Sequence, residues 1–146
     1  MKKFDDTQLY KLLYGKDFSN IKDFLEKYGL DSVDRNGRTF LMTAVVDSDE
    51  ELVRNLLLIG CDIDKQDEQG LTALHLSAMN NKTDSIKILL DFKADVNLVD
   101  NMGNSALWRA AMELESDSEI IKLLLENGAD VNLENKNGVS PKDLLG

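Results

Sequence analysis

A repeat of 33 residues is the feature of this sequence that most limits its possible folds. Three segments align when each is written from its aspartate, at Asp34, Asp67 and Asp100, and the spacing is 33 residues in both cases. The aligned fragments are DRNGRTFLMTA, DEQGLTALHLSA and DNMGNSALWRAA. Each contains a polar turn with glycine, a serine or threonine that can cap a helix, and the start of an apolar helical pattern. This repetition predicts a solenoid in which each unit stacks on the next.

Each segment continues into a second helical run, and the ends of these runs also repeat. The runs are LVRNLLLIG, SIKILLDFK and IIKLLLENG, and they place Gly60, Lys93 and Gly128 at the same position. A glycine there can adopt the left-handed conformation that ends a helix, whereas Lys93 must adopt it at some local cost. Each unit is therefore predicted to be a helix, a short turn, a second helix and an extended loop.

These features together resemble the ankyrin repeat, whose signature is a 33-residue period, a β-turn, two helices and the string TPLHxA. The string appears here as TALHLSA at residues 72–78, with TFLMTA and SALWRAA as relatives. The resemblance implies an all-α ankyrin-repeat solenoid, and it covers residues 34–134 well and the two ends approximately. The motif proline is replaced by Phe40, Ala73 and Ala106, but proline at the first helical position is optional. Asn55 lies where a core leucine is usual.

The two ends of the chain are predicted to be capping units. Two helix candidates, at residues 5–14 and 18–28, resemble a degenerate N-terminal repeat. The final stretch, NKNGVSPKDLLG, restarts the motif and stops after part of one helix. Terminal units of this kind cover the last hydrophobic faces of a solenoid. We therefore expect one domain over residues 1–146, divided into a cap at 1–33, full repeats at 34–66, 67–99 and 100–134, and a partial cap at 135–146.

The charge balance limits the classes of partner. The chain has 17 Lys and Arg against 27 Asp and Glu, a formal net charge of -10 and a pI near 4.5. Such a charge repels phosphate backbones and anionic membranes, so we expect no nucleic acid and no membrane partner. The same charge is compatible with a protein partner that has a basic surface.

Other features of the sequence favour a cytoplasmic protein, and we expect the protein to be a monomer. The lone Cys61 cannot form an intramolecular disulfide, and it fits a reducing compartment. Asp5 and Asp6 stand where a signal peptide would begin its apolar stretch, and no run of 18 apolar residues occurs. We also expect no cofactor.

Few residues in the sequence could carry catalytic or metal chemistry. His75 occupies the position of the motif histidine, and the resemblance implies that its ring holds the turn and the helix start. Cys61 takes a position that is alanine in the later repeats, which favours a packed, inert thiol. No sequence motif of a hydrolase, nucleotide-binding loop or zinc protease is present. An enzyme is therefore not expected.

The acidic stretch AMELESDSEI at residues 111–120 has three possible interpretations: a metal loop, a contact for a basic partner or a solvated turn. It lacks the glycine of a calcium-binding loop, which disfavours the first. The distance from Gly103 to Gly138 is 35 residues rather than 33, so two extra residues enlarge the turn between the paired helices. Ser116 or Asp117 is predicted to cap the second helix, with Glu119 in its first turn. Glu113 and Glu115 are left as a contact or a solvated loop.

The resemblance also implies where a partner binds, because ankyrin repeats usually bind through a concave face of turn tips and inner helices. Positions on these elements are interpreted as free of the core, with Leu71, Met79, Met102 and Met112 forming an apolar strip beside acids. For the single tryptophan, packing in the seam between repeats is favoured over contact with a partner. The predicted partner-binding residues are Arg35, Arg38, Val46, Asp47, Glu68, Leu71, Met79, Asn80, Met102, Asn104, Trp108, Met112, Glu113 and Glu115.

Three hypotheses for the function follow. The first is a non-enzymatic module that binds a protein partner through the concave face. The second is an acidic inhibitor or immunity protein that neutralises a basic toxin, since opposite charge accelerates association. The third is a structural scaffold that oligomerises through an exposed cap.

Overall fold

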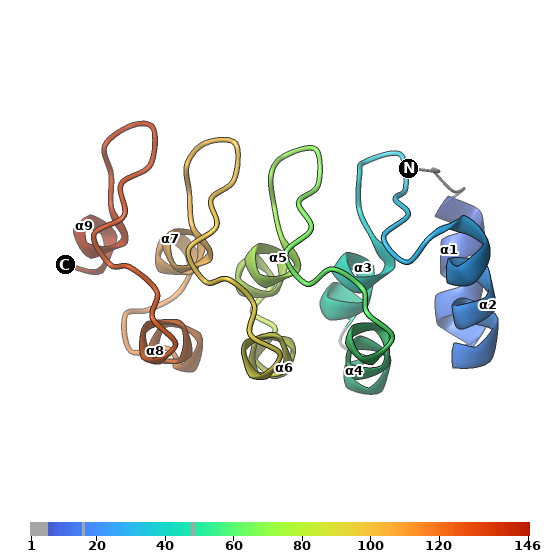
Figure 1. Cartoon of the computed structure of the whole chain (residues 1–146). Helices are drawn as coiled ribbons and strands as arrows, with labels where there is room; N and C mark the ends of the chain where they lie inside the picture. Colours follow the sequence, from blue (N-terminus) through green and yellow to red (C-terminus); the bar gives the residue numbers. More distant parts are fainter. Residues whose placement is uncertain (1–5, 16, 48) are drawn as a thin grey trace.

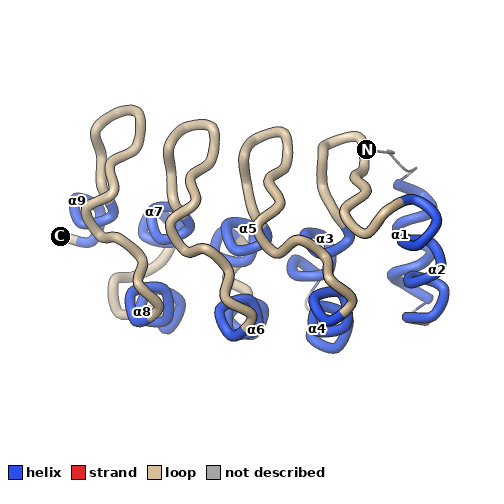
Figure 2. Tube along the Cα trace, in the orientation of Figure 1, coloured by secondary structure: helices blue, strands red, loops and turns tan. Residues whose placement is uncertain are grey.

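The computed structural model describes residues 6–15, 17–47 and 49–146, and within them the chain forms a row of stacked helix pairs (Figure 1). Regular secondary structure in these residues is helical, and an isolated antiparallel bridge joins Val99 and Ser105. Figure 2 shows long loops that all project to the same side of the row. The helices are α1 (Asp6–Gly15), α2 (Phe18–Tyr28), α3 (Phe40–Asp47), α4 (Glu50–Leu58), α5 (Ala73–Met79), α6 (Thr83–Asp91), α7 (Ala106–Glu113), α8 (Glu119–Glu126) and α9 (Pro141–Leu145).

The repeating unit is a projecting turn, an inner helix and an outer helix, as the sequence predicts. The inner helices α3, α5, α7 and α9 lie in one row beside the turns, and the outer helices α4, α6 and α8 lie in a second row (Figure 1). Thr72 and Ser105 cap inner helices by accepting hydrogen bonds from the backbone N–H groups of His75 and Trp108. A side-chain oxygen at this position satisfies one of the unpaired N–H groups of the first turn.

Equivalent leucines of successive repeats build one continuous core. Leu41, Leu74 and Leu107 come from the inner helices and are at most 2% exposed. The outer helices contribute another buried set, Leu56, Leu89 and Leu124. A single unit could not bury these side chains alone, so stacking of neighbours supplies the hydrophobic stabilisation.

The predicted positions of the left-handed helix ends are confirmed. Gly60 and Gly128 have φ of 101° and 91°, and Lys93 at the same position has φ of 68°. Lys93 therefore adopts the left-handed conformation that glycine adopts at the equivalent position of the other repeats. Its side chain makes this conformation less favourable than it is for glycine.

The two ends of the row are built differently. At the C-terminal end, Pro141 opens the short helix α9 and Ser140 forms a capping box with Asp143. At the N-terminal end, α1 and α2 match the two helix candidates. Figure 1 shows this hairpin at a slant, whereas α5 to α8 are seen nearly end-on. The seam between the hairpin and the first full repeat consequently differs from the seams between full repeats.

Candidate functional site

The four projecting turns share one local design, in which a side-chain oxygen replaces the backbone partners that a tight turn lacks. In the second turn, Oδ1 of Asp67 accepts hydrogen bonds of 2.9 Å from the N–H groups of both Gln69 and Leu71. Asp34 and Asp100 accept the same pair of bonds in their turns, and Asn135 does so in the last one. The carboxylate or amide thereby fixes the direction in which each turn projects.

Successive turns are also joined to one another through their backbones. The N–H of Asn101 donates to the carbonyl of Gln69 at 3.0 Å, and the N–H of Lys136 donates to the carbonyl of Met102 at 3.0 Å. Arg38 connects the first two turns, because its Nε lies 3.5 Å from Oδ2 of the buried Asp67. The turns and the inner helices therefore form a preorganised surface, which we call the inner face.

Most of the predicted partner-binding residues are accessible on the inner face. Met79, Met102 and Met112 are 38%, 50% and 54% exposed. Met79 and Met112 occupy the same position near the ends of α5 and α7, whereas Met102 lies in a turn. The exposed polar positions of the set are Arg35, Asp47, Glu68, Asn80, Glu113 and Glu115, and the half-buried positions are Arg38, Val46 and Trp108.

Two positions of the predicted set belong to the interior, so the interpretation of them as free of the core was wrong. Leu71 is only 2% exposed and belongs to the hydrophobic core. Asn104 is 4% exposed, and its side-chain Oδ1 accepts a 2.8 Å hydrogen bond from Asn135. Both residues end their turns, where the chain has already bent back toward the inner helices. The apolar strip therefore lacks its leucine.

Trp108 lies at the edge between the core and the inner face. Its indole Nε1 is buried and, within the described residues, has no hydrogen-bond partner. The guanidinium carbon of Arg109 lies 5.8 Å from the centre of its ring. This placement supports the packing role that was favoured for the tryptophan.

Sequence reasoning missed the role of Arg109. Its Nε donates to Oδ2 of Asp100 at 2.9 Å, and its second guanidinium nitrogen contacts the same oxygen. The carboxylate of Asp100 thus connects the third turn to helix α7. An Asp and an Arg nine residues apart give no recognisable motif, because only the fold of the turn brings them together.

His75 has the structural role that the resemblance implied. It is 1% exposed, its Nδ1 accepts a hydrogen bond from the N–H of Thr72, and its Nε2 lies 2.8 Å from the carbonyl oxygen of Asn104. The ring is therefore neutral, with its proton on Nε2. Burial lowers the pKa of His75, against the opposing effect of the hydrogen bond to Asn104. Both ring nitrogens are occupied in holding the turn to the helix.

The buried histidine predicts a pH dependence of stability. Below its ordinary pKa of 6.5, the unfolded chain binds a proton that folded His75 resists. The free energy of unfolding should therefore have its maximum contribution from His75 above about pH 6.5. It should fall as the pH drops toward the lower pKa of folded His75. No other histidine titrates in this range, because the sequence contains one. Urea unfolding between about pH 7.5 and pH 5.5 measures the fall.

The control for this prediction is His75→Met, because Met42 holds the equivalent position in the first repeat. There Met42 Sδ lies 3.4 Å from the N–H of Thr39, so a thioether can stand beside this turn. The variant should be less stable at neutral pH but should lose most of the pH dependence. A variant whose stability falls as steeply as the wild type would contradict the assignment to His75.

Cys61 has the features of an inert thiol. It is 7% exposed, and its Sγ lies 3.6 Å from the carbonyl oxygen of Leu30. Burial, followed by the charge of Asp31, raises the pKa of Cys61 to about 12. A thiol with this pKa carries almost no thiolate at neutral pH, and the thiolate is the reactive form.

The acidic stretch forms the enlarged turn that the repeat spacing predicts. Residues 114–118 separate α7 from α8, whereas residues 80–82 separate α5 from α6. The predicted cap at Ser116 or Asp117 was wrong, since Ser118 caps α8 by accepting from the N–H of Ile121. The turn places Ser118 there through a 2.9 Å bond from its own N–H to the carbonyl of Glu115. Glu119 lies in the first turn of α8, as predicted.

Two further features of the described residues concern metals and membranes. No group of three or more His, Cys, Asp or Glu side chains there is arranged to hold a metal ion. None of the helices in those residues has both the length and the apolar character needed to cross a membrane.

Comparison with known proteins agrees with the architecture. Residues 41–135 match the family described as "Ankyrin repeats (3 copies)". The comparison with curated proteins gave no match. Ankyrin repeats are generally protein–protein interaction modules without enzymatic activity. The period, the turns, the paired helices and the match over most of the chain lead to one conclusion: this protein belongs to the ankyrin-repeat family.

Proposed function

We propose that this chain is a non-enzymatic binding module that recognises a folded protein through its inner face. The observation that carries the proposal is the exposure of Met79, Met102 and Met112 on elements that are otherwise held rigidly. Methionine is a flexible, polarisable side chain that adapts to apolar partners. Exposed apolar side chains on a preorganised scaffold favour association, because little backbone conformational entropy is lost on binding.

The charge of the inner face favours a partner with a basic surface. Asp47, Glu68, Glu113 and Glu115 are exposed beside the apolar positions. The repeat at residues 100–134 alone contains eight acidic and two basic residues. Opposite charge on the partner would accelerate association and would make its rate fall with added salt. The side chains most suited to catalysis, His75 and Cys61, are both buried in structural roles, which supports a non-enzymatic function.

The test compares two double variants with the wild-type chain as immobilised bait. Met79→Arg with Met102→Arg places two charges on the inner face. Leu58→Arg with Leu125→Arg places the same two charges on the outer helices, at side chains that are 71% and 40% exposed. A partner of the inner face should be retained by the wild type and by the outer variant, and the inner variant should weaken its binding at least about tenfold. Equal retention by the inner variant would show that the binding surface lies elsewhere.

A further inference from the structure

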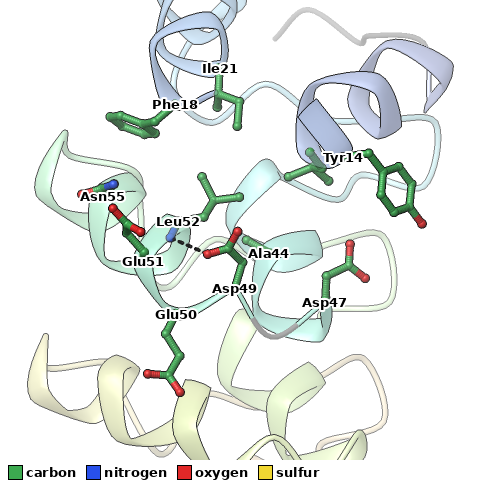
Figure 3. A pocket seen from close by; sticks show the side chains of 11 residues that line it. Tyr14, Phe18, Ile21, Ala44, Asp47, Asp49, Glu50, Glu51, Leu52 and Asn55 are labelled. Atoms are coloured by element: carbon green, nitrogen blue, oxygen red, sulfur yellow. Dashed lines mark hydrogen bonds between the residues drawn. The ribbon is translucent and has the colours of Figure 1, made fainter. Parts of the chain in front are cut away.

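A cavity of about 710 Å³ lies between the α1–α2 hairpin and the first full repeat, and Figure 3 shows its lining. Its floor is apolar: Leu13 and Ile21 come from the hairpin, and Ala44 and Leu52 come from α3 and α4. The half-buried Phe18 lies at one side. This volume falls within the range of roughly 300–1,000 Å³ that is typical of ligand pockets. The pocket is separate from the methionines of the inner face.

The rim of this pocket is acidic. Asp47 ends α3, and Asp49 and Glu51 belong to the start of α4. Figure 3 shows that the side chain of Glu50 turns away from these three, toward the second repeat. Tyr14, which is 77% exposed, stands on the hairpin side of the opening. None of the described residues that line the pocket is a lysine, arginine or histidine.

A corresponding seam between full repeats shows what a cation does at this position. Glu119, in the first turn of α8, forms a 2.8 Å ion pair with Lys87 of the neighbouring helix α6. Glu51 is the equivalent residue of α4, and it makes no ion pair with any described residue. Asn55 lines the pocket at the position that Ile88 fills in α6, where the isoleucine is 1% exposed. Among the described residues, the seam beside the cap therefore lacks both the paired cation and the apolar side chain.

We propose that this pocket binds a basic segment of a partner protein that carries one large apolar side chain. The apolar side chain occupies the floor formed by Ile21, Ala44 and Leu52, where burial is favourable. A lysine or arginine beside it pairs with Glu51, in the way that Lys87 pairs with Glu119, and a second cation faces Asp47 or Asp49. Both parts of the ligand are needed, because the floor has no polar group for a cation and the rim repels acidic segments.

The test uses synthetic peptides and the full chain. The probe is a dye-labelled five-residue peptide with a central tryptophan flanked by two lysines on each side, capped at both ends. Two matched peptides replace the tryptophan with glycine or the lysines with glutamate. Fluorescence anisotropy measures the affinity, and amide chemical shifts of the isotope-labelled chain locate the site. The tryptophan–lysine peptide should bind most tightly, with shifts concentrated at Leu13, Phe18 and Leu52.

Charge-reversal variants separate this pocket from general attraction to an acidic protein. Asp47→Lys with Glu51→Lys should weaken peptide binding at least about tenfold, whereas Glu113→Lys with Glu115→Lys, which changes the net charge equally, should weaken it much less. Asp47→Asn with Glu51→Gln keeps the side-chain shapes and should give an intermediate loss of affinity. This variant tests the role of the two charges even if the lysine variant fails to fold. Equal losses in both lysine variants, shifts confined to the inner face, or equal binding of free tryptophan amide would overturn the proposal. The pocket variants leave the inner-face methionines intact and share only Asp47 with the acidic part of the inner face, so the methionine variants described above test the proposed function separately.

Discussion

Replacing Gly70 with alanine should destabilise the protein by about 3 kcal/mol or more, through the loss of stacking between two turns. Gly70 has φ of 79°, which alone costs an alanine about 1–2 kcal/mol. The added Cβ would also lie 2.7 Å from Oδ1 and 2.8 Å from N of Asn101. Asn101 must then move, which weakens its bonds to the carbonyls of Gln69 and Glu68 at about 1 kcal/mol each. Urea unfolding at neutral pH measures the loss.

Two matched glycines separate the clash from the backbone strain. Gly138 has nearly the same φ, 73°, but apart from its chain neighbours no described residue comes within 4 Å of the place a Cβ would take, so Gly138→Ala should show the strain alone. Gly37 belongs to an internal turn, like Gly70, but a Cβ there would meet its neighbours less closely, at 3.0 Å from the side chain and 3.1 Å from the backbone nitrogen of Glu68. The loss in free energy of unfolding caused by Gly37→Ala should therefore lie between the losses caused by Gly70→Ala and Gly138→Ala. Equal losses at Gly70 and Gly138 would show that stacking of the turns contributes little.

Removing the carboxylate of Asp100 should have an effect of similar size. Asp100 is 4% exposed, and Asp100→Ala leaves the N–H groups of Met102 and Asn104 without their acceptor. It also leaves Arg109, whose side chain is 28% exposed, without its partner. Unpaired buried donors cost about 1–3 kcal/mol each, so we expect a total loss of about 3 kcal/mol. Urea unfolding again provides the measurement.

The asparagine variant divides this effect into its two parts. Asp100→Asn keeps the turn acceptor, as Asn135 does naturally in the last turn, but it removes the ion pair with Arg109. Its loss should be about half of that caused by alanine. In an Arg109→Met background the ion pair is already absent, so Asp100→Asn should lower the free energy of unfolding little further. If asparagine were as harmful as alanine in both backgrounds, the two turn bonds would not be the stabilising interaction.

The fold could be predicted from the sequence because its information is local and repeated. Asp34, Asp67 and Asp100 recur with the same glycine, capping residue and leucine, and each set specifies a turn and the start of a helix without reference to distant residues. Repetition then fixes the tertiary arrangement, since units with the same apolar face can only bury it against one another. The two candidate helices of the cap were found by the same apolar spacing.

The candidate site was predictable only in part. The exposure of Met79, Met102 and Met112 followed from their positions in the repeat, and the structure confirms it. Leu71 and Asn104 were wrongly predicted to be exposed. Each ends its own turn, and in the sequence a residue at this position looks as polar or as variable as the residues at the tip of the turn. The cap residue of α8 was misplaced by one or two positions, since an inserted turn has no counterpart in the other repeats.

The repeat period, the paired helices, the acidic character and the structural positions of His75 and Cys61 all follow from the sequence alone. These features depend on spacing and on residue type, which a single chain displays directly. Packing in three dimensions was needed to pair Arg109 with Asp100, to bury Leu71, and to leave a pocket lined by Tyr14, Asp47 and Glu51 beside the slanted cap. Each of these depends on the orientation of one element relative to another, and such orientations arise from contacts between units rather than from the pattern within one.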